Sequence, residues 1–400
     1  MIPYGRQDIR DSDIESVVRV LRSDFLTQGP AVPRFERVVA ARTGAAHAVA
    51  VHSATAALHI ACMALGLKPG MRLWTVPNTF VASANCARYC GADVDFVDID
   101  ARTWNVSVPQ LAAKLARARA MNQLPHIVVP VHFAGQPTEQ EAVHALSLQF
   151  GFRILEDASH SIGATRAGEP VGSCRWSDIT VFSFHPVKII TTGEGGMALT
   201  NDAQLAERMR MLRTHGITRD AQQWRATADA TAETGAGVAA DAAATPWYYE
   251  QQLLGLNYRM TDVQAALGCS QIERLDEYVE RRNRLASRYD ALLDGLPLQL
   301  PHVLEGNRSA FHLYVVRLSR ETLDRRGYGV IFNGLRQRGI GVNLHYLPVH
   351  LQPYYRDLGF AAGQYPQAEQ HGRSALSLPM YPLLTESQQD QVVAALRELL

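Results

Sequence analysis

Short apolar runs alternate with amphipathic segments through the first half of the chain. Runs of apolar and β-branched residues predict buried strands, and apolar residues that recur every three to four positions predict helices. Buried strands that alternate with helices are typical of an α/β fold, a mainly parallel sheet with helices on both faces. In such a sheet, ligands bind beyond the carboxyl ends of the strands. The predicted strands are residues 45–51, 72–76, 94–97, 126–131, 153–156 and 179–184, and the predicted helices between them include residues 53–67 and 79–90.

The pattern changes in the second half of the chain. Residues 220–246 are rich in Ala, Thr, Gly and Asp, with too few large apolar side chains to offset the entropy of ordering, so we expect a mobile insertion. Residues 261–293 predict one long helix or a broken pair. Shorter strands and helices follow, at residues 313–318, 331–338, 340–344 and 386–400. These segments predict a smaller C-terminal α+β domain.

The two patterns together predict two domains. Residues 1–250 would form an N-terminal segment and the large domain, and residues 251–400 the linking helices and the small domain. The 400 residues are 47% apolar and 20% charged, which is typical of a globular protein. A formal net charge of zero gives no reason to expect a nucleic-acid or anionic membrane partner.

The chain carries no pattern that predicts export or membrane insertion. Its first residues lack the apolar core of a signal peptide, and no apolar run reaches the length of a membrane span. Five scattered cysteines without a CxxC pair suit reduced thiols. We therefore expect a cytoplasmic protein that has no membrane partner.

One lysine follows a predicted buried strand. Residues 182–188 read Phe-Ser-Phe-His-Pro-Val-Lys, and glycines stand at 193, 195 and 196. Burial disfavours the ammonium form, so an apolar, glycine-lined loop lowers a lysine pKa from about 10.4 and makes the amine a nucleophile that can form a Schiff base. Most lysines near glycines are solvated loop residues, so Lys188 needs support from other positions.

Three further strand ends carry candidate binding groups. Residues 53–57 (Ser-Ala-Thr-Ala-Ala) open a helix directly after a strand, which suits an anion or phosphate, although an ordinary helix cap has the same pattern. Asp157, followed by His160, could bind an aromatic nitrogen cation or simply cap a helix. Phe80 could lie against a flat ring, although most such side chains belong to a core.

Several other kinds of site do not fit the sequence. A GxGxxG between a strand and a helix is missing, and the glycines stand after Lys188 rather than before a Lys-Ser/Thr pair, so neither a nicotinamide site nor a P-loop is supported. His345 and His350 do not have helical zinc-ligand spacing, and no metal site is predicted. Pyridoxal phosphate needs a lysine, an acid, an aromatic side chain and a helix N-terminus, which Lys188, Asp157, Phe80 and residues 53–56 supply.

A series of motifs occurs in a fixed order along the chain. Because of these motifs, the chain resembles the DegT/DnrJ/StrS-type sugar aminotransferases, which are pyridoxal-phosphate enzymes of fold type I. The resemblance runs from about residue 3 to the end of the chain. The motifs are residues 27–30 (Thr-Gln-Gly-Pro), 53–58 (Ser-Ala-Thr-Ala-Ala-Leu), 156–160 (Glu-Asp-Ala-Ser-His), 182–188, 193–196 (Gly-Glu-Gly-Gly), 257–260 (Asn-Tyr-Arg-Met) and 345–350 (His-Tyr-Leu-Pro-Val-His).

This resemblance implies a role for each matching residue. Lys188 would form the Schiff base with pyridoxal 5′-phosphate and then move a proton between the donor's Cα and the cofactor, with pyridoxamine phosphate as the intermediate form. Asp157 would pair with the ring nitrogen N1, and His160 would lie beside the 3-hydroxyl. The retained Lys188 favours transamination over the dehydration that relatives with a histidine at this position carry out.

The same resemblance implies a shared phosphate site. Thr55 and Ala56 would hold the phosphate through their backbone, and Ser183 would add a hydroxyl. Asn257 would reach the phosphate of a neighbouring subunit, which implies a homodimer with shared active sites.

Residues 23–30, 132–135, 191–192 and 247–249 resemble one branch of the family. That branch transfers the amino group of L-glutamate to C4 of a UDP-linked 4-keto-6-deoxy-N-acetylhexosamine in the pseudaminic acid pathway. The Ala-rich insertion before Trp247 departs from the branch and leaves the sugar open. The expected substrate contacts are Tyr4, Leu26, Thr27, Ala54, Ser183, Asn257, His345 and Tyr346.

Two alternatives stay open at this point. The first is the same chemistry on another nucleotide ketosugar: a UDP-4-amino sugar of different configuration, GDP-perosamine, or a 3-keto sugar. The second is a regulatory protein that binds pyridoxal phosphate without catalysis, although the presence of Lys188, Asp157 and His160 together argues against it.

Overall fold

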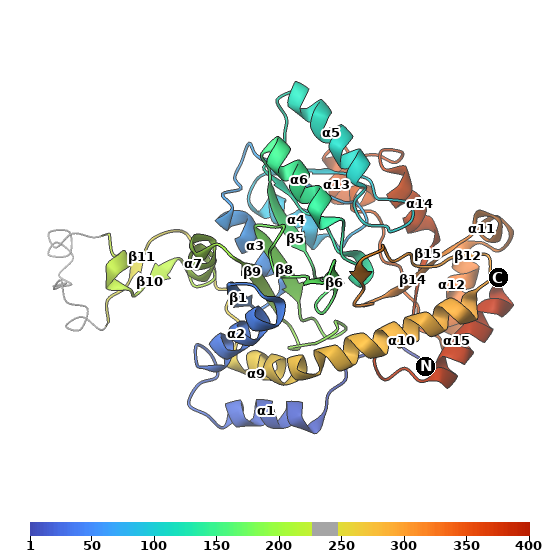
Figure 1. The fold of residues 1–400 in the computed structure, drawn as a ribbon, viewed down its shortest axis with the longest axis horizontal. Helices are drawn as coiled ribbons and strands as arrows, with labels where there is room; N and C mark the ends of the chain where they lie inside the picture. Colours follow the sequence, from blue (N-terminus) through green and yellow to red (C-terminus); the bar gives the residue numbers. More distant parts are fainter. Residues whose placement is uncertain (226–246) are drawn as a thin grey trace.

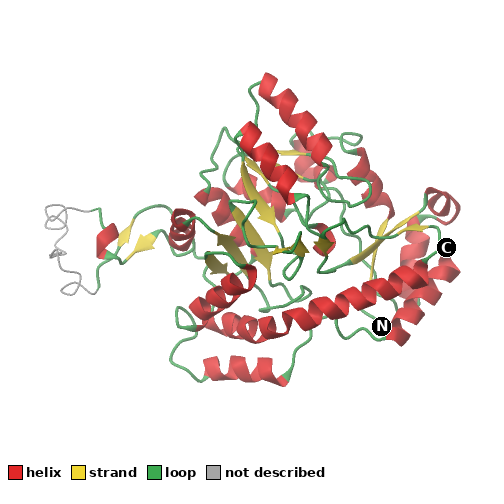
Figure 2. Cartoon of the chain, viewed as in Figure 1, coloured by secondary structure: helices red, strands yellow, loops and turns green. Residues whose placement is uncertain are grey.

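A seven-stranded sheet forms the centre of the molecule (Figures 1 and 2). The computed structural model describes residues 1–225 and 247–400, so most of the predicted insertion at 220–246 lies outside the described residues. The strand order is β1-β9-β8-β5-β4-β2-β3; β9 runs antiparallel to both its neighbours, and β8, β5, β4, β2 and β3 are parallel. The mainly parallel sheet predicted from the sequence is confirmed. The strands are β1 (His47–Val51), β2 (Arg72–Thr75), β3 (Asp93–Phe96), β4 (Ile127–Val128), β5 (Arg153–Asp157), β8 (Ile179–Ser183) and β9 (Gly196–Thr200).

Helices cover both faces of this sheet, which explains why its strands are apolar throughout. Successive strand residues point to opposite faces, so Val181 packs in one core and Phe182 in another. The first core is covered by α3 (Ala54–Ala64), α4 (Ala82–Tyr89) and α7 (Ala203–Leu212), and the second by α2 (Ala31–Thr43) and α9 (Asp262–Gln271). A third core joins β2, β4 and β5 to α5 (Val108–Ala120) and α6 (Gln140–Phe150).

The segment expected as one long helix or a broken pair is a broken pair. The helix α9 leads through the 3-10 turn Ile272–Arg274 into α10 (Leu275–Leu293), which runs along the molecule towards the chain ends in Figure 1. α1 (Asp11–Leu21) packs against α9.

The C-terminal part is built on a three-stranded antiparallel sheet. Its core also contains Ile2, which pairs with Ile340, so the start of the chain packs against this part. The sheet order is β12 (Leu298–Gln299), β14 (Tyr314–Leu318), β15 (Ala375–Leu378), and the helices are α11 (Arg320–Arg326), α12 (Tyr328–Gln337), α13 (Pro353–Asp357), α14 (Pro366–Ser374) and α15 (Glu386–Leu399). Two small sheets complete the described structure: β6 (Thr165–Arg166) with β7 (Glu169–Pro170) and β13 (Asn307–Arg308), and β10 (Ile217–Thr218) with β11 (Glu250–Gln251).

Three elements differ from their predicted extent. Residues 340–344 form single bridges to Ile2 and Ser377 instead of a regular element, because their backbone bonds divide between two partners. The strand expected at 126–131 pairs over two residues and ends before Pro130, which has no N–H to donate. The helix expected from residue 79 begins at Ala82.

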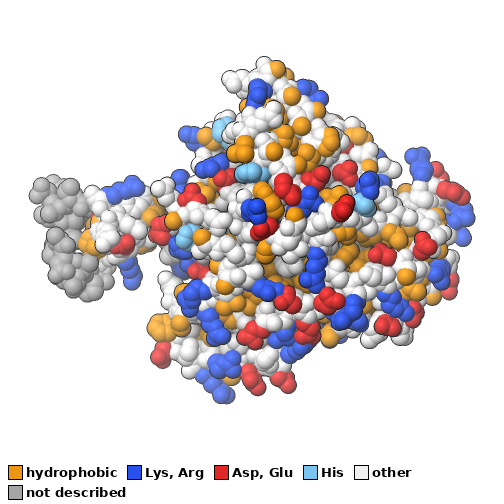
Figure 3. Space-filling view, viewed as in Figure 1, with side chains coloured by type: hydrophobic (Ala, Val, Ile, Leu, Met, Phe, Trp, Pro, Cys, Tyr) orange, Lys and Arg blue, Asp and Glu red, His pale blue; other side chains and the backbone are white. Residues whose placement is uncertain are grey.

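Acidic and basic side chains are interspersed over the face of the molecule drawn in Figure 3. Among the helices of residues 1–225 and 247–400, none is long and apolar enough to cross a bilayer.

Candidate functional site

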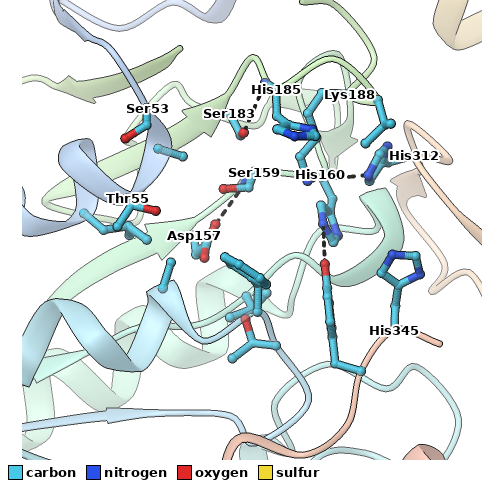
Figure 4. Close-up of a pocket in the computed structure, with 18 of the residues that line it drawn as sticks. Ser53, Thr55, Asp157, Ser159, His160, Ser183, His185, Lys188, His312 and His345 are labelled. Atoms are coloured by element: carbon cyan, nitrogen blue, oxygen red, sulfur yellow. Dashed lines mark hydrogen bonds between the residues drawn. The ribbon is translucent and has the colours of Figure 1, made fainter. Parts of the chain in front are cut away.

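A cavity of about 420 Å³ opens where the large sheet meets the C-terminal part. Asp157 ends β5 and Ser183 ends β8, so the cavity lies at the carboxyl edge of the sheet, as the topology predicts. Figure 4 shows Ser53 and Thr55 at one side, with Lys188 and His312 at the other. The lining residues are Tyr4, Ser53, Ala54, Thr55, Leu58, Thr79, Phe80, Ala82, Val131, Asp157, Ser159, His160, Ser183, His185, Val187, Lys188, Glu194, His312, Asn343, Leu344, His345 and Tyr346.

The N-terminus of α3 forms one wall of the cavity. Ser53 caps the helix by accepting a 3.2 Å hydrogen bond from the Ala56 N–H. Gly196, the first residue of β9, packs directly on this start: a Cβ there would lie 2.4–2.5 Å from backbone atoms of Ser53 and Ala54. First-turn N–H groups lack helical partners and carry the positive end of the helix dipole, so this wall suits an anion such as phosphate.

A buried carboxylate lies between the two sides of the cavity. Asp157 Oδ2 accepts a 2.6 Å hydrogen bond from the Ser83 hydroxyl, and Oδ1 accepts a 3.1 Å bond from the Ser159 N–H. These bonds hold the carboxylate in place and leave it lining the cavity. It can pair with a cationic nitrogen of a bound ring.

Lys188 faces the cavity in an environment that favours its neutral amine. Removal from water lowers the pKa of Lys188 to about 8, although the negative charge of Asp157 acts in the opposite direction. Its Nζ lies 3.5 Å from Nε2 of His312. An amine with a pKa near neutrality can act both as a nucleophile and as an acid or base.

Four histidines line the cavity, His160, His185, His312 and His345, and the charge of Lys188 lowers the pKa of each. His160 accepts a 3.3 Å bond from the Ala134 N–H at Nδ1, so Nε2 carries the proton and faces the Tyr346 hydroxyl at 3.1 Å. Burial and the nearby positive Lys188 lower the pKa of His160 and His312 well below the usual range, and that of His345 to about 3. The histidines of the cavity are therefore neutral near pH 7.

The structure brings together most of the residues predicted from the sequence. Tyr4, Ala54, Thr55, Phe80, Asp157, His160, Ser183, Lys188, His345 and Tyr346 all line the cavity.

Four predicted residues lie outside this cavity. The Ala56 N–H donates a hydrogen bond to the Ser53 hydroxyl. Asn257 is exposed, and its backbone forms an isolated β-bridge with Thr214. Leu26 and Thr27 contact the start of α9, where Leu26 accepts a bond from the Asp262 N–H. The motif at residues 27–30 has a structural role there, because the Asp262 carboxylate accepts bonds from the N–H groups of Gly29, Ala31 and Val32.

Other residues of the site were missed from the sequence. Ser83 lies inside a predicted helix, and its bond to Asp157 joins residues 74 positions apart. His312 comes 124 positions after Lys188 and lies outside the ordered family motifs. Its position directly before the predicted strand at 313–318 was the one available signal. Asn343 and Leu344 reach the cavity from the C-terminal part.

Comparisons with known proteins agree with this geometry. The model of the DegT/DnrJ/EryC1/StrS aminotransferase family matches residues 7–397. The chain is 37% identical to the spore coat polysaccharide biosynthesis protein SpsC of Bacillus subtilis (strain 168), over 100% of this chain and 97% of SpsC.

Solved structures show the same similarity. Helicobacter pylori PseC, an aminotransferase involved in the biosynthesis of pseudoaminic acid, superposes with a TM-score of 0.87 at 27% identity, covering 100% of this chain and 98% of PseC. Spr1654 from Streptococcus pneumoniae in its PLP form gives a TM-score of 0.85 at 27% identity, covering 100% of this chain and 99% of Spr1654. The fold is that of fold type I pyridoxal-phosphate transferases. The protein therefore belongs to the DegT/DnrJ/EryC1/StrS aminotransferase family.

Proposed function

We propose that this sugar aminotransferase uses pyridoxal phosphate to move the amino group of L-glutamate to the C4 keto group of a UDP-linked 4-keto-6-deoxy-N-acetylhexosamine. The observation that carries the proposal is Lys188, a lysine with a pKa of about 8 that lines the same cavity as the Asp157 carboxylate and the N-terminus of α3. The similarity to PseC and SpsC, both named for sugar pathways, supports the sugar substrate.

The side chains and backbone groups that line the cavity fit pyridoxal phosphate. The start of α3 and the Ser183 hydroxyl would hold the phosphate, Asp157 would pair with the ring nitrogen, and Phe80 would flank the ring. Gly196 supports this fit, because a side chain at that position would displace the phosphate-binding turn. A relative of the same fold, Spr1654, has been solved in both a PLP form and a PMP form.

The residues of the chain would bind and move protons around the cofactor. The chemistry supplied by bound pyridoxal phosphate is an aldehyde that accepts amino groups and a ring that withdraws electrons. Lys188 would hold the cofactor, and its Nζ would carry a proton between the donor's Cα and the cofactor. The negative charge of Asp157, held in place by its bonds to Ser83 and Ser159, would keep the ring nitrogen of the cofactor protonated.

The C-terminal part would provide the sugar contacts. Tyr4, His345 and Tyr346 line the cavity, and their polar atoms suit sugar hydroxyls. Figure 4 shows His345 on the side away from Ser53 and Thr55. His345 is neutral and oriented by a 2.7 Å bond to the Ser377 hydroxyl. It can therefore exchange hydrogen bonds with an uncharged hydroxyl group.

We further propose a homodimer with shared active sites. Asn257 is exposed and does not line the cavity of its own chain, so its phosphate contact would have to be made in a second copy. The substrate roles of Leu26 and Thr27 and the division of the chain into domains 1–250 and 251–400 also stay predictions.

The proposal is tested by the absorbance of the holoenzyme before and after L-glutamate is added. We expect a band near ~420 nm from lysine-bound cofactor that decays to ~330 nm as the donor reacts. Adding the UDP-4-keto sugar should then restore the first band, and NMR of the product should place the amine at C4. An amine at C3, or turnover of a GDP sugar in place of the UDP sugar, would contradict the proposed substrate but not the aminotransferase chemistry.

A matched pair of lysine variants controls this experiment. Lys188→Ala should lose both spectral changes, whereas Lys68→Ala removes an exposed lysine and should behave as the wild type. A wild-type protein that binds the cofactor but ignores every amino donor would favour the regulatory alternative and refute catalysis.

A further inference from the structure

His312 is a buried cavity residue to which the proposed function assigns no role. It lies just before β14, and a buried arginine on α10 holds its backbone: Arg282 Nη1 donates to the carbonyl oxygens of Phe311 and His312 at 3.1 Å and of Met380 at 3.0 Å. These three bonds place the ring of His312 against Lys188. Among the described residues its Nδ1 has no hydrogen-bond partner, so the polar interaction of this ring is directed at Lys188.

The surroundings decide which of the two groups carries the proton. Burial is the main reason that an imidazolium at His312 is disfavoured, and the positive charges of Lys188 and Arg282 act in the same direction. A charge on His160 or His345 would add to this effect, but both are neutral near pH 7. Lys188, in contrast, faces the carboxylate of Asp157, which stabilises an ammonium. The other ionisable groups that line the cavity are Tyr4, His185, Glu194 and Tyr346. When one proton is present, it therefore lies on Nζ of Lys188 and not on the imidazole.

We propose that His312 is a catalytic residue, whose neutral Nε2 accepts a hydrogen bond from the Lys188 ammonium and keeps this lysine basic enough to take a proton from the amino donor. The proposal deepens the proposed function and rests on it. The distance of 3.5 Å is at the long end for a hydrogen bond, as is common for catalytic pairs before substrate binds.

The physical reason lies in the desolvation of Lys188. Burial favours the neutral amine, and deeply buried lysines fall to pKa values of about 5–6, too low for a base that works near neutral pH. An uncharged acceptor stabilises the ammonium without adding a second charge to the cavity. A hydrogen bond to a charged group shifts such an equilibrium by about one pKa unit or more, which is tenfold in the protonation constant.

The lysine content of the chain allows a direct test without cofactor. The protein has only three lysines, Lys68, Lys114 and Lys188, so mass spectrometry can follow the labelling of each amine by acetic anhydride against pH. Lys68 is exposed, and Lys114 pairs with Asp95, which makes them internal controls in every sample. In the wild-type apoenzyme, the labelling of Lys188 should reach half of its maximum near pH 8.

Two amide variants separate hydrogen bonding from packing. In His312→Gln the amide reaches the position of Nε2, whereas in His312→Asn it reaches only the position of Nδ1. We expect His312→Asn to lower the labelling midpoint of Lys188 by about one pH unit, and His312→Gln to stay near the wild type. An unchanged midpoint for Lys114, which pairs with Asp95, would show that both variants are folded, and the exposed Lys68 would control for the labelling reaction itself. A wild-type midpoint for Lys188 in His312→Asn would overturn the proposal, and so would equal shifts in both variants.

A second readout uses the loaded enzyme. With α-deuterated L-glutamate, His312→Asn should slow the half-reaction about tenfold and increase its deuterium isotope effect, because proton removal becomes more strongly rate-limiting. An isotope effect equal to that of the wild type would contradict a role in proton transfer. If the wild type itself ignored glutamate, the proposed function would fail, while the labelling of the apoenzyme would still decide whether His312 acts on Lys188.

Discussion

Replacing Gly196 with alanine tests whether β9 positions the N-terminus of α3, the proposed phosphate site. The added Cβ would lie 2.4–2.5 Å from backbone atoms of Ser53 and Ala54, whereas real Cβ contacts stay above 3.0 Å and are ordinary from 3.4 Å. The start of α3 would therefore have to move by about 0.6–1.0 Å. Backbone cannot rotate aside as a flexible side chain can, so we expect a loss of about 1–3 kcal/mol in the free energy of unfolding.

The same displacement should weaken cofactor binding. The first-turn N–H groups of α3 would no longer converge on the phosphate, and the loss of one hydrogen bond to a charged group raises a dissociation constant about tenfold or more. The assay is a fluorescence titration of apoenzyme with pyridoxal phosphate, together with urea unfolding of the same samples. The matched control is Gly329→Ala in α12, where a Cβ meets nothing within 4 Å. Wild-type cofactor affinity in Gly196→Ala would refute the reasoning.

Three further predictions concern the carboxylates and the lysine. Ser83→Ala removes the 2.6 Å bond to the buried Asp157 carboxylate and should slow turnover about tenfold, measured as kcat; unchanged kcat would contradict this. Asp262→Ala leaves three N–H groups at the start of α2 without their acceptor and should cost about 3 kcal/mol in urea unfolding, and a loss below about 1 kcal/mol would argue against the cap. Since the neutral amine is the reactive form, a Lys188 pKa of about 8 predicts that apoenzyme takes up pyridoxal phosphate faster as pH rises and levels off above about pH 8; a rate that still climbs at about pH 10 would show an ordinary lysine.

Local patterns in the sequence predicted most strands of the large sheet and about half of the residues that line the cavity. The apolar runs at β5 and β8 are visible without tertiary context because strands buried on both faces need apolar residues at every position. Parallel strands end at a common edge, so Asp157, Ser183 and Lys188 could be assigned to one site before any distance was known. The ordered motifs added the family, which the comparisons confirm.

Local patterns were less informative where backbone bonds go to distant partners. Residues 340–344 are apolar enough to predict a regular element, yet their bonds divide between Ile2 and Ser377. The motif at residues 27–30 supports the family resemblance, but the bonds from Gly29 and Ala31 to the Asp262 carboxylate join residues more than 230 positions apart, which no local pattern predicts.

The sequence by itself determined which segments of the large sheet are buried, and which lysine and which acid stand at strand ends. The tertiary structure alone decided what surrounds that lysine. The hydrogen bonds that do so join segments 29 to 124 positions apart: Ser83 to Asp157, Lys188 to His312, and Arg282 to the carbonyl oxygen of Phe311. Periodicity reports whether a residue is buried, but the identity of its neighbour depends on how whole helices and sheets pack, which no local pattern encodes.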